Sequence, residues 1–213
     1  MWWIALFGIC ALADPKPPLW PNKFMQTFKE TTTFSGGSLS GPYTTKGTYY
    51  YDWSVKRYKV YRDNGRHDRF CGPNGFKLFE DTPCSHIVVD GDRYLHYPEK
   101  NECCYCCSEE HGCGMLFPTW LQDAEYIGEE EHMGVKSYKW NKPGLQNNFY
   151  YETIAEDPLD RTMLSIYQEP NDLQDFHDFS SSIPQGTLDL PSVCSKTTTC
   201  SYFSTCTLLR SSF

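Results

Sequence analysis

The chain has 213 residues and a formal net charge of −8. This acidic balance excludes nucleic acid as a partner, because neutralising phosphates requires clustered Lys and Arg. The length allows one domain of ordinary size, and an aromatic content of 16% favours half-buried β-strands over helices.

Residues 1–13, MWWIALFGICALA, are apolar throughout and end in a small-x-small pattern, which predicts a cleaved signal peptide. The segment is too short to cross a bilayer, which takes about 20 residues. No later window is long and apolar enough, so we expect no transmembrane segment. The protein is expected to be secreted into the extracellular space or an endomembrane lumen. Residues 14–194 are predicted to form a single β domain, followed by a Ser/Thr/Cys-rich C-terminal tail over 195–213.

Short aromatic or β-branched runs alternate with turn signals along the chain. The runs predict strands over 22–33, 47–53, 56–61, 76–79, 85–89, 93–97, 124–129, 135–140, 146–154, 162–168 and 176–179. One short helix is predicted over 118–124, and 35–45 and 130–134 are predicted to be loop and turn. The even spacing is typical of an all-β fold, for which we predict a curved antiparallel sheet.

Loss of Cys10 with the signal peptide leaves an even number of cysteines. In an exported protein such a count predicts a disulfide framework. The ten predicted to form bridges are Cys71, Cys84, Cys103, Cys104, Cys106, Cys107, Cys113, Cys194, Cys200 and Cys206. Their connectivity is left open by the sequence.

Five of these cysteines fall within 103–113, beside His111. Zinc is the alternative to disulfides there, but structural zinc usually takes well-separated pairs of ligands. Adjacent cysteines instead point to opposite sides of an extended backbone. We therefore expect no metal site, and we expect this loop to be stapled to two different parts of the fold.

Other sequence features do not indicate an enzyme or a cofactor. The acidic runs at 109–110 and 129–131 lack the spacing expected of a glycoside hydrolase pair or a calcium loop, and solvated turn charges explain them better. The six histidines occur singly. No nucleophile elbow, zinc-protease motif or phosphate-cradling loop is present.

Aromatic residues are distributed over most of the predicted strands. One interpretation is ordinary core packing, and the other is an apolar ligand pocket on the concave face of the sheet. The residues predicted to line such a pocket are Trp53, Phe117, Trp120, Tyr126, Trp140 and Tyr150.

Five segments occur in an order that resembles a known family: WPNKF at 20–24, YYDW at 50–53, LFPTWLQDAEYIG at 116–128, YKW at 138–140 and FYYE at 149–152. They resemble an uncharacterised family of small secreted proteins of plants and protists, some of which carry a glycosyl-transfer label. More distantly, the layout is similar to ependymin and bacterial lipoprotein carriers, which implies a half-barrel holding an apolar ligand. Ser137 stands where plant members tend to have Cys, so their disulfide pairing cannot be transferred.

We therefore expect a secreted, non-catalytic binding protein that holds a lipid or another apolar or amphipathic ligand on the concave face of its sheet. A carbohydrate-active enzyme, acting by glycosyl transfer or hydrolysis, is the first alternative. An extracellular surface or matrix protein is the second, and bridging of Cys200 or Cys206 between chains would support it.

Overall fold

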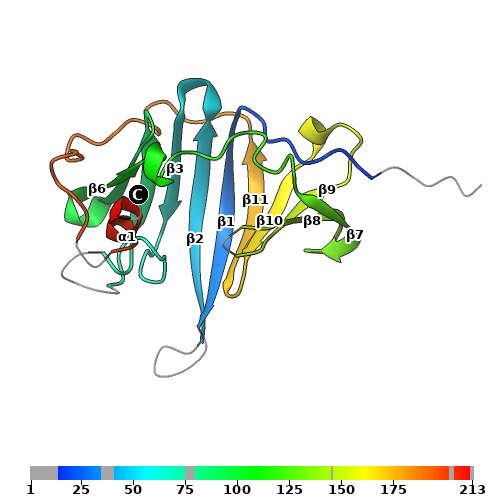
Figure 1. Cartoon of the computed structure of the whole chain (residues 1–213), viewed down its shortest axis with the longest axis horizontal. Helices are drawn as coiled ribbons and strands as arrows, with labels where there is room; N and C mark the ends of the chain where they lie inside the picture. Colours follow the sequence, from blue (N-terminus) through cyan, green and yellow to red (C-terminus); the bar gives the residue numbers. More distant parts are fainter. Residues whose placement is uncertain (1–13, 35–40, 75–79, 145, 202–203, 212–213) are drawn as a thin grey trace, which may run out of the picture.

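The computed structural model describes residues 14–34, 41–74, 80–144, 146–201 and 204–211. The predicted signal peptide and the strand predicted over 76–79 lie outside the described residues. Within them, one antiparallel sheet of 11 strands has the order β6-β5-β4-β3-β2-β1-β11-β10-β9-β8-β7 (Figure 1). The strands are β1 (Lys23–Phe34), β2 (Gly41–Asp52), β3 (Arg57–Arg62), β4 (Cys84–Val89), β5 (Asp92–Tyr97), β6 (Glu102–Ser108), β7 (Glu125–His132), β8 (Val135–Lys142), β9 (Asn148–Thr153), β10 (Met163–Gln168) and β11 (Asp172–Ser180).

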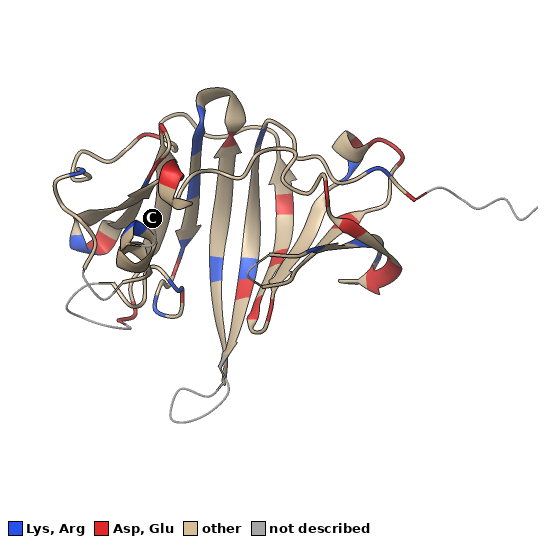
Figure 2. Cartoon of the chain, viewed as in Figure 1, with Lys and Arg blue, Asp and Glu red and all other residues tan. Residues whose placement is uncertain are grey.

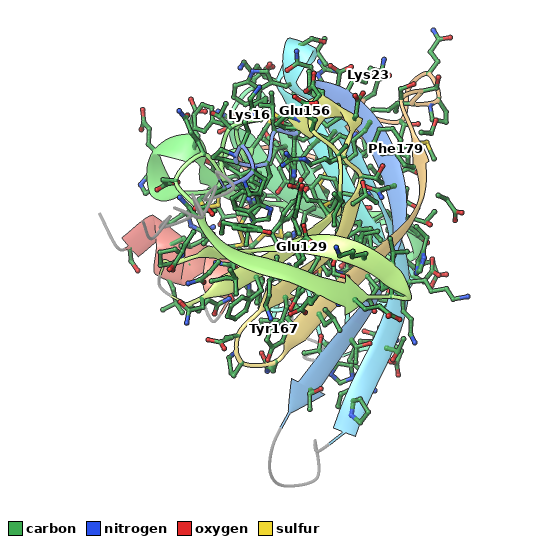
Figure 3. The ribbon with its side chains drawn as sticks, turned by 90° about the vertical axis from the view of Figure 1, so that its right-hand side faces the viewer. Lys16, Lys23, Glu129, Glu156, Tyr167 and Phe179 are labelled. Carbon is green, nitrogen blue, oxygen red and sulfur yellow. A yellow bond between two sulfur atoms is a disulfide. The ribbon has the colours of Figure 1, made fainter. Side chains whose placement is uncertain are left out.

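The strand order explains the shape of the molecule. The chain builds β1 to β6 outward to one edge, crosses the sheet, and returns from β7 to β11, which pairs with β1. The crossing segment, residues 109–124, passes over the sheet near its upper end (Figure 1). Figure 3 shows the sheet bending round its side chains, with Lys16 and Glu156 close together at the upper end and Tyr167 near the lower end. The predicted curved, antiparallel, all-β fold is confirmed, and the sheet is open.

The concave face is specified by alternation along the long central hairpin. On β1, Phe24, Gln26, Phe28 and Glu30 are buried at every second position, because successive side chains of a strand point to opposite faces. In the cross-strand register Gly47 stands between Phe28 and Arg62. A Cβ there would lie 2.3 Å from the Phe28 ring, so only glycine fits at this position.

The upper part of the concave face is a closed aromatic core. Trp20 binds the crossing segment, because its backbone N–H donates to Pro118 O at 3.0 Å, and its indole donates to the Tyr150 hydroxyl at 3.1 Å. Leu121 inserts from above and is fully buried. The buried members of this cluster, here called the aromatic core, are Trp20, Phe24, Phe28, Tyr49, Tyr51, Tyr58, Val60, Val88, Leu121, Trp140, Tyr150, Met163, Ile166 and Phe176.

The single short helix lies elsewhere than predicted. Residues 118–124 form successive turns, with Thr119 O accepting from Gln122 N at 2.9 Å. The α-helix of the described residues is α1 (Thr205–Ser211), in the C-terminal tail. Arg210 near its end donates to the backbone carbonyls of Cys106 and Cys200, and these contacts seat the helix on β6.

Strand boundaries also differ from the prediction, and β11 begins at Asp172 instead of at 176. The stretch 102–108, predicted as a loop, is strand β6 and pairs with β5. Strand β2 begins at Gly41, inside the predicted loop 35–45. Strand β7 continues to His132 through the acidic run. In each case pairing with a neighbouring strand outweighs the weak β propensity of the local residues.

All ten predicted cysteines form disulfides, pairing as Cys71–Cys84, Cys103–Cys194, Cys104–Cys200, Cys106–Cys206 and Cys107–Cys113. Three of the bonds fasten the tail to β6. Because Cys103 and Cys104 point to opposite faces of the strand, the tail has to pass round the edge. It does so where Tyr105 N donates to Thr198 O at 2.7 Å and Cys200 N donates to Tyr105 O at 2.9 Å.

Within the described part of the chain, no helix has the length and apolar character needed to cross a membrane.

Candidate functional site

Two of the six residues predicted to line an apolar pocket belong to the aromatic core, three pack against it, and one is exposed. Trp140 and Tyr150 are 1% and 2% exposed, and Trp53, Trp120 and Tyr126 pack against the same aromatic core. Phe117 is 61% exposed, with its ring 5.0 Å from that of Trp53. None of the six lines either pocket described below. Their ligand-lining role stays a prediction.

Below the aromatic core, the concave face becomes polar. Figure 2 shows charged positions on the central strands β1, β2 and β11, below the crossing segment, and of these Glu30 is buried in phase with the inward-facing Phe28. A pocket of about 270 Å³ lies here, between the lower ends of β1 and β2 and the connection from β3 to β4. The residues that line it, here called the polar pocket, are Glu30, Thr32, Tyr43, Thr44, Thr45, Asn64, Arg66, His67, Asp68 and Asp81.

A buried arginine organises the inner wall of the polar pocket. Arg62 Nε lies 2.5 Å from Glu30 Oε2 and its Nη2 lies 2.8 Å from Oε1, which is a bidentate pair. Arg62 Nη2 is also 3.4 Å from Asp68 Oδ2. Burial alone would lower the pKa of Arg62, but these two carboxylates outweigh it and raise the pKa. The guanidinium therefore stays charged and holds both carboxylates in place.

Asp68 is held by a second set of donors. Its Oδ1 lies 2.8 Å from His86 Nε2 and accepts backbone N–H groups from Phe70 and Cys71 at 3.0 and 2.7 Å. Burial favours the neutral acid, yet His86, Arg62 and the Cys71 N–H lower the pKa of Asp68. Burial also lowers the pKa of His86. At neutral pH the ring is uncharged and donates to an ionised Asp68.

A further carboxyl lies beside this cluster on β11. Asp172 is opposite Thr32 in the β1–β11 register, and Gln174 is opposite Glu30. Gln174 Nε2 donates to Glu30 Oε1 at 2.6 Å. Burial, followed by the charge of Glu30, raises the pKa of Asp172 to about 7. Asp172 therefore exchanges its proton near neutral pH, next to a wall of fixed charges.

The outer wall carries paired charges and a ring stack. Asp81 accepts from Asn64 Nδ2 at 2.8 Å and from Arg66 at 2.8 Å. The rings of Tyr43 and His67 stack with centroids 3.6 Å apart. The carboxylates at 30, 68 and 81 are each matched by a cation or an amide, so the wall offers donors and acceptors without a large net charge.

Unsatisfied polar atoms concentrate in this part of the molecule. Among the described residues, the buried side-chain nitrogen and oxygen atoms without a hydrogen-bond partner are Arg62 Nη1, Arg66 Nε, Thr82 Oγ1, Trp120 Nε1, Asn141 Oδ1 and Asp172 Oδ1. Four of these six belong to the polar pocket or to residues next to its lining. Each such atom left without a partner costs about 1–3 kcal/mol, so these atoms call for a partner such as a bound water or a ligand.

None of the residues that line the polar pocket was among the predicted site residues, although the strand pattern carries a signal for two of the charges. Glu30 lies in phase with Phe24 and Phe28 on β1, and Arg62 lies in phase with Tyr58 on β3. A charged residue in phase with inward-facing apolar residues is buried, and buried charges are paired. Glu30 and Arg62 carry opposite charges and lie on the inward-facing side of nearby strands, which predicts that they contact each other.

Two other polar clusters have structural roles. Arg161 Nη1 binds Glu152 Oε1 at 2.8 Å and the Lys16 carbonyl at 2.8 Å, which ties the N-terminal segment to β9. Ser165 Oγ lies 2.6 Å from both His132 Nε2 and Asp175 Oδ1. Because the fully buried serine stands between the histidine and the aspartate, this trio lacks the order of a nucleophilic triad.

Possible metal ligands cluster in two places among the described residues. They are Cys106, Cys107 and Cys113, and Asp68, Cys71 and His86, with ligand atoms within 4.8 Å of one another in each set. The cysteines of both sets are in disulfides, so their sulfurs are not available as thiolates.

A second pocket, of about 440 Å³, lies between the upper ends of β1 to β3 and residues 183–189. Four of its charged groups form two pairs, Lys23 with the buried Asp52 at 3.4 Å and Arg57 with Asp189 at 3.2 Å, and Asp90 also lines it. The residues that line this second pocket include no network of buried charges comparable to the one around Arg62. The polar pocket is therefore the stronger candidate for a functional site.

Comparisons with known proteins show similarity of structure only. No protein-family model matches the chain, and no curated protein matches it. An uncharacterised conserved protein from Thermus thermophilus is similar with a TM-score of 0.48 and 9% identity, over 80% of this chain and 86% of that one. A structure of PNGF-II is similar with a TM-score of 0.40 and 7% identity, over 82% of this chain and 31% of that one.

Proposed function

We propose that this is an exported, non-catalytic binding protein that holds a small polar ligand in the polar pocket. The observation that carries the proposal is the wall itself. Charged side chains held in fixed positions by Arg62 stand behind an open cavity of about 270 Å³, beside a concentration of unsatisfied buried atoms. A preformed cavity with a few fixed polar groups is the usual form of a ligand site.

Export is supported by the five disulfides, since such bonds persist in oxidising compartments. The apolar ligand expected from the aromatic strands is the less favoured alternative, because the aromatic core fills the upper concave face with side chains. A role in matrix assembly loses its specific support, because Cys200 and Cys206 are bonded within the chain.

A hydrolytic role is also less favoured. Glu30 and Asp68 face the same cavity, but a glycoside hydrolase needs one acid that keeps its proton and one base that can take one. The pKa of Asp68 is lowered, and both oxygens of Glu30 already accept hydrogen bonds. Neither residue is free to transfer a proton.

Native mass spectrometry of the mature protein tests the proposal. The protein is incubated with a polar pool of glucose, galactose, mannose, N-acetylglucosamine, lysine, glutamate and putrescine, and separately with a lipid extract. A saturable adduct from the polar pool is expected. A lipid adduct with no polar adduct would overturn the proposal in favour of the apolar site, and no adduct from either mixture would overturn it outright.

A further inference from the structure

The composition of the pocket wall restricts the chemistry of its ligand. The carboxylates at 30, 68 and 81 share two guanidinium groups, Arg62 and Arg66, and Asp68 also bonds to the uncharged His86 ring, so a single net negative charge remains. A strongly charged ligand would need an uncompensated opposite charge, because desolvating an unpaired ion is costly. A neutral ligand meets no such requirement.

A neutral ligand must also form hydrogen bonds of both kinds, because the pocket wall offers both donors and acceptors. Asp81 accepts one bond on each oxygen, and an ionised carboxylate has about four lone-pair sites. Arg66 and Asn64 supply N–H donors at the same wall. Hydroxyl groups both donate and accept, so a ligand with several hydroxyls would match this mixture at many positions.

The strand side of the pocket adds hydroxyls of its own. Thr32 on β1 and Thr45 on β2 line the cavity, in phase with the inward-facing Glu30 and next to the phenol of Tyr43. The cavity volume of about 270 Å³ is just below the range of about 300–1,000 Å³ typical of sites for drug-sized ligands. The space suits one small ring.

Resting on the proposed function, we propose that the polar pocket binds a neutral, polyhydroxylated ligand of monosaccharide size. The hydroxyls of the ligand donate to the Asp81 carboxylate and accept from Arg66 and Asn64, while Thr32 contacts the ring from the strand side. The recognition is non-covalent and requires no metal or cofactor.

Amide chemical-shift mapping by NMR on the full mature chain tests this proposal. Glucose, galactose, mannose and N-acetylglucosamine are titrated one at a time, followed by lysine, glutamate and putrescine as charged probes. At least one sugar is expected to produce saturable shifts at Thr32, Asn64 and Arg66, with little response to the charged probes.

The variant Thr32→Val keeps the β-branched shape and removes one hydroxyl. It should weaken sugar binding about two- to tenfold, as expected for the loss of one hydrogen bond. Thr48→Val on β2 is the matched control, because Thr48 is half-buried like Thr32 but lies outside the pocket lining. It should bind like the wild type.

Each outcome decides between the two proposals. Pocket shifts caused only by charged probes would overturn the sugar assignment and leave the proposed binding function standing. Sugar binding that Thr32→Val and Thr48→Val weaken equally would overturn the assignment to this pocket. No pocket shift with any probe would overturn both.

Discussion

The disulfide between Cys106 and Cys206 offers a stability prediction whose size follows from the topology. The bond links residues 100 positions apart, and an isolated crosslink of that length stabilises a protein by about 4.7 kcal/mol through loop closure. The neighbouring bond Cys104–Cys200 already holds the tail, however. Counted from that bond, the extra loop has only about eight residues, two on β6 and six in the tail. Such a loop contributes about 2.5 kcal/mol.

The double substitution C106A/C206A tests this nesting. Removing two buried sulfur atoms adds a cavity cost of about 1 kcal/mol, so we expect a total loss of about 3.5 kcal/mol. The measurement is equilibrium unfolding in guanidinium chloride without reductant, with the free energy extrapolated to water. A loss of about 5.7 kcal/mol would refute the reasoning, because it would mean that the other two bonds do not restrain the tail. A loss below about 1 kcal/mol would show that the Cys106–Cys206 bond adds no stability beyond the neighbouring bonds.

The remaining predictions concern titration and packing. Asp172 has a folded-state pKa of about 7, above its unfolded value of about 3.9. Between these two pH values the unfolded chain binds fewer protons than the folded chain. The free energy of unfolding therefore falls as pH rises from about 4 to 7. The contribution of Asp172 is up to about 4 kcal/mol. Glu152, whose pKa is also raised to about 7 by burial, contributes a fall over the same range, so Asp172→Asn should make the pH slope shallower without abolishing it in urea titrations at several pH values; an unchanged slope would contradict the assignment. Gly47→Ala should destabilise the protein by at least ~1–3 kcal/mol, because the added Cβ would lie 2.2 Å from Tyr61 O. Gly41→Ala is the control and should change the stability little, because the atom nearest to its Cβ would be 3.7 Å away. Leu121→Ala should lower the free energy of unfolding by about 2–5 kcal/mol. Leu116→Ala, on the same crossing segment, is the control and should lower it little, because the Leu116 side chain is 41% exposed. Equal losses in the two variants would contradict the view that the crossing segment closes the core.

Strand positions were predictable wherever alternation was clean. The strand predicted over 56–61 corresponds to β3, where Tyr58 and Val60 are buried at alternate positions. Trp140 and Tyr150, predicted to lie on the concave face, are buried there in the aromatic core. The same signal failed at β6, because a run of cysteines has no contrast between apolar and polar positions. That strand exists because it pairs with β5 on one side and is fixed by the tail on the other.

The helix was misplaced for a related reason. Local pattern favoured 118–124, but that segment has to present Trp120 and Leu121 to the aromatic core while its backbone binds Trp20. Those contacts hold it in successive turns. The tail helix, in contrast, depends on Cys206 and on Arg210, which binds carbonyls about 100 residues away. Such long-range contacts are not visible in a local sequence window.

The polar pocket could be predicted only in part. The phase of Glu30 and Arg62 along their strands marks them as buried, and their pairing follows from nearby strands. The contribution of Asp68, Asn64 and Asp81 could not be predicted, because these residues come from an irregular connection whose path is set by the Cys71–Cys84 disulfide and the Asp68–His86 bond.

The central claim is that a ligand binds at the polar pocket and not in the aromatic core. A crystal structure of the mature protein soaked with the four monosaccharides tests this claim most directly. We predict ring-shaped density in the pocket, within hydrogen-bond distance of Asp81 and Arg66. Density among Trp140, Tyr150 and their neighbours, or an empty pocket at saturating sugar, would contradict it.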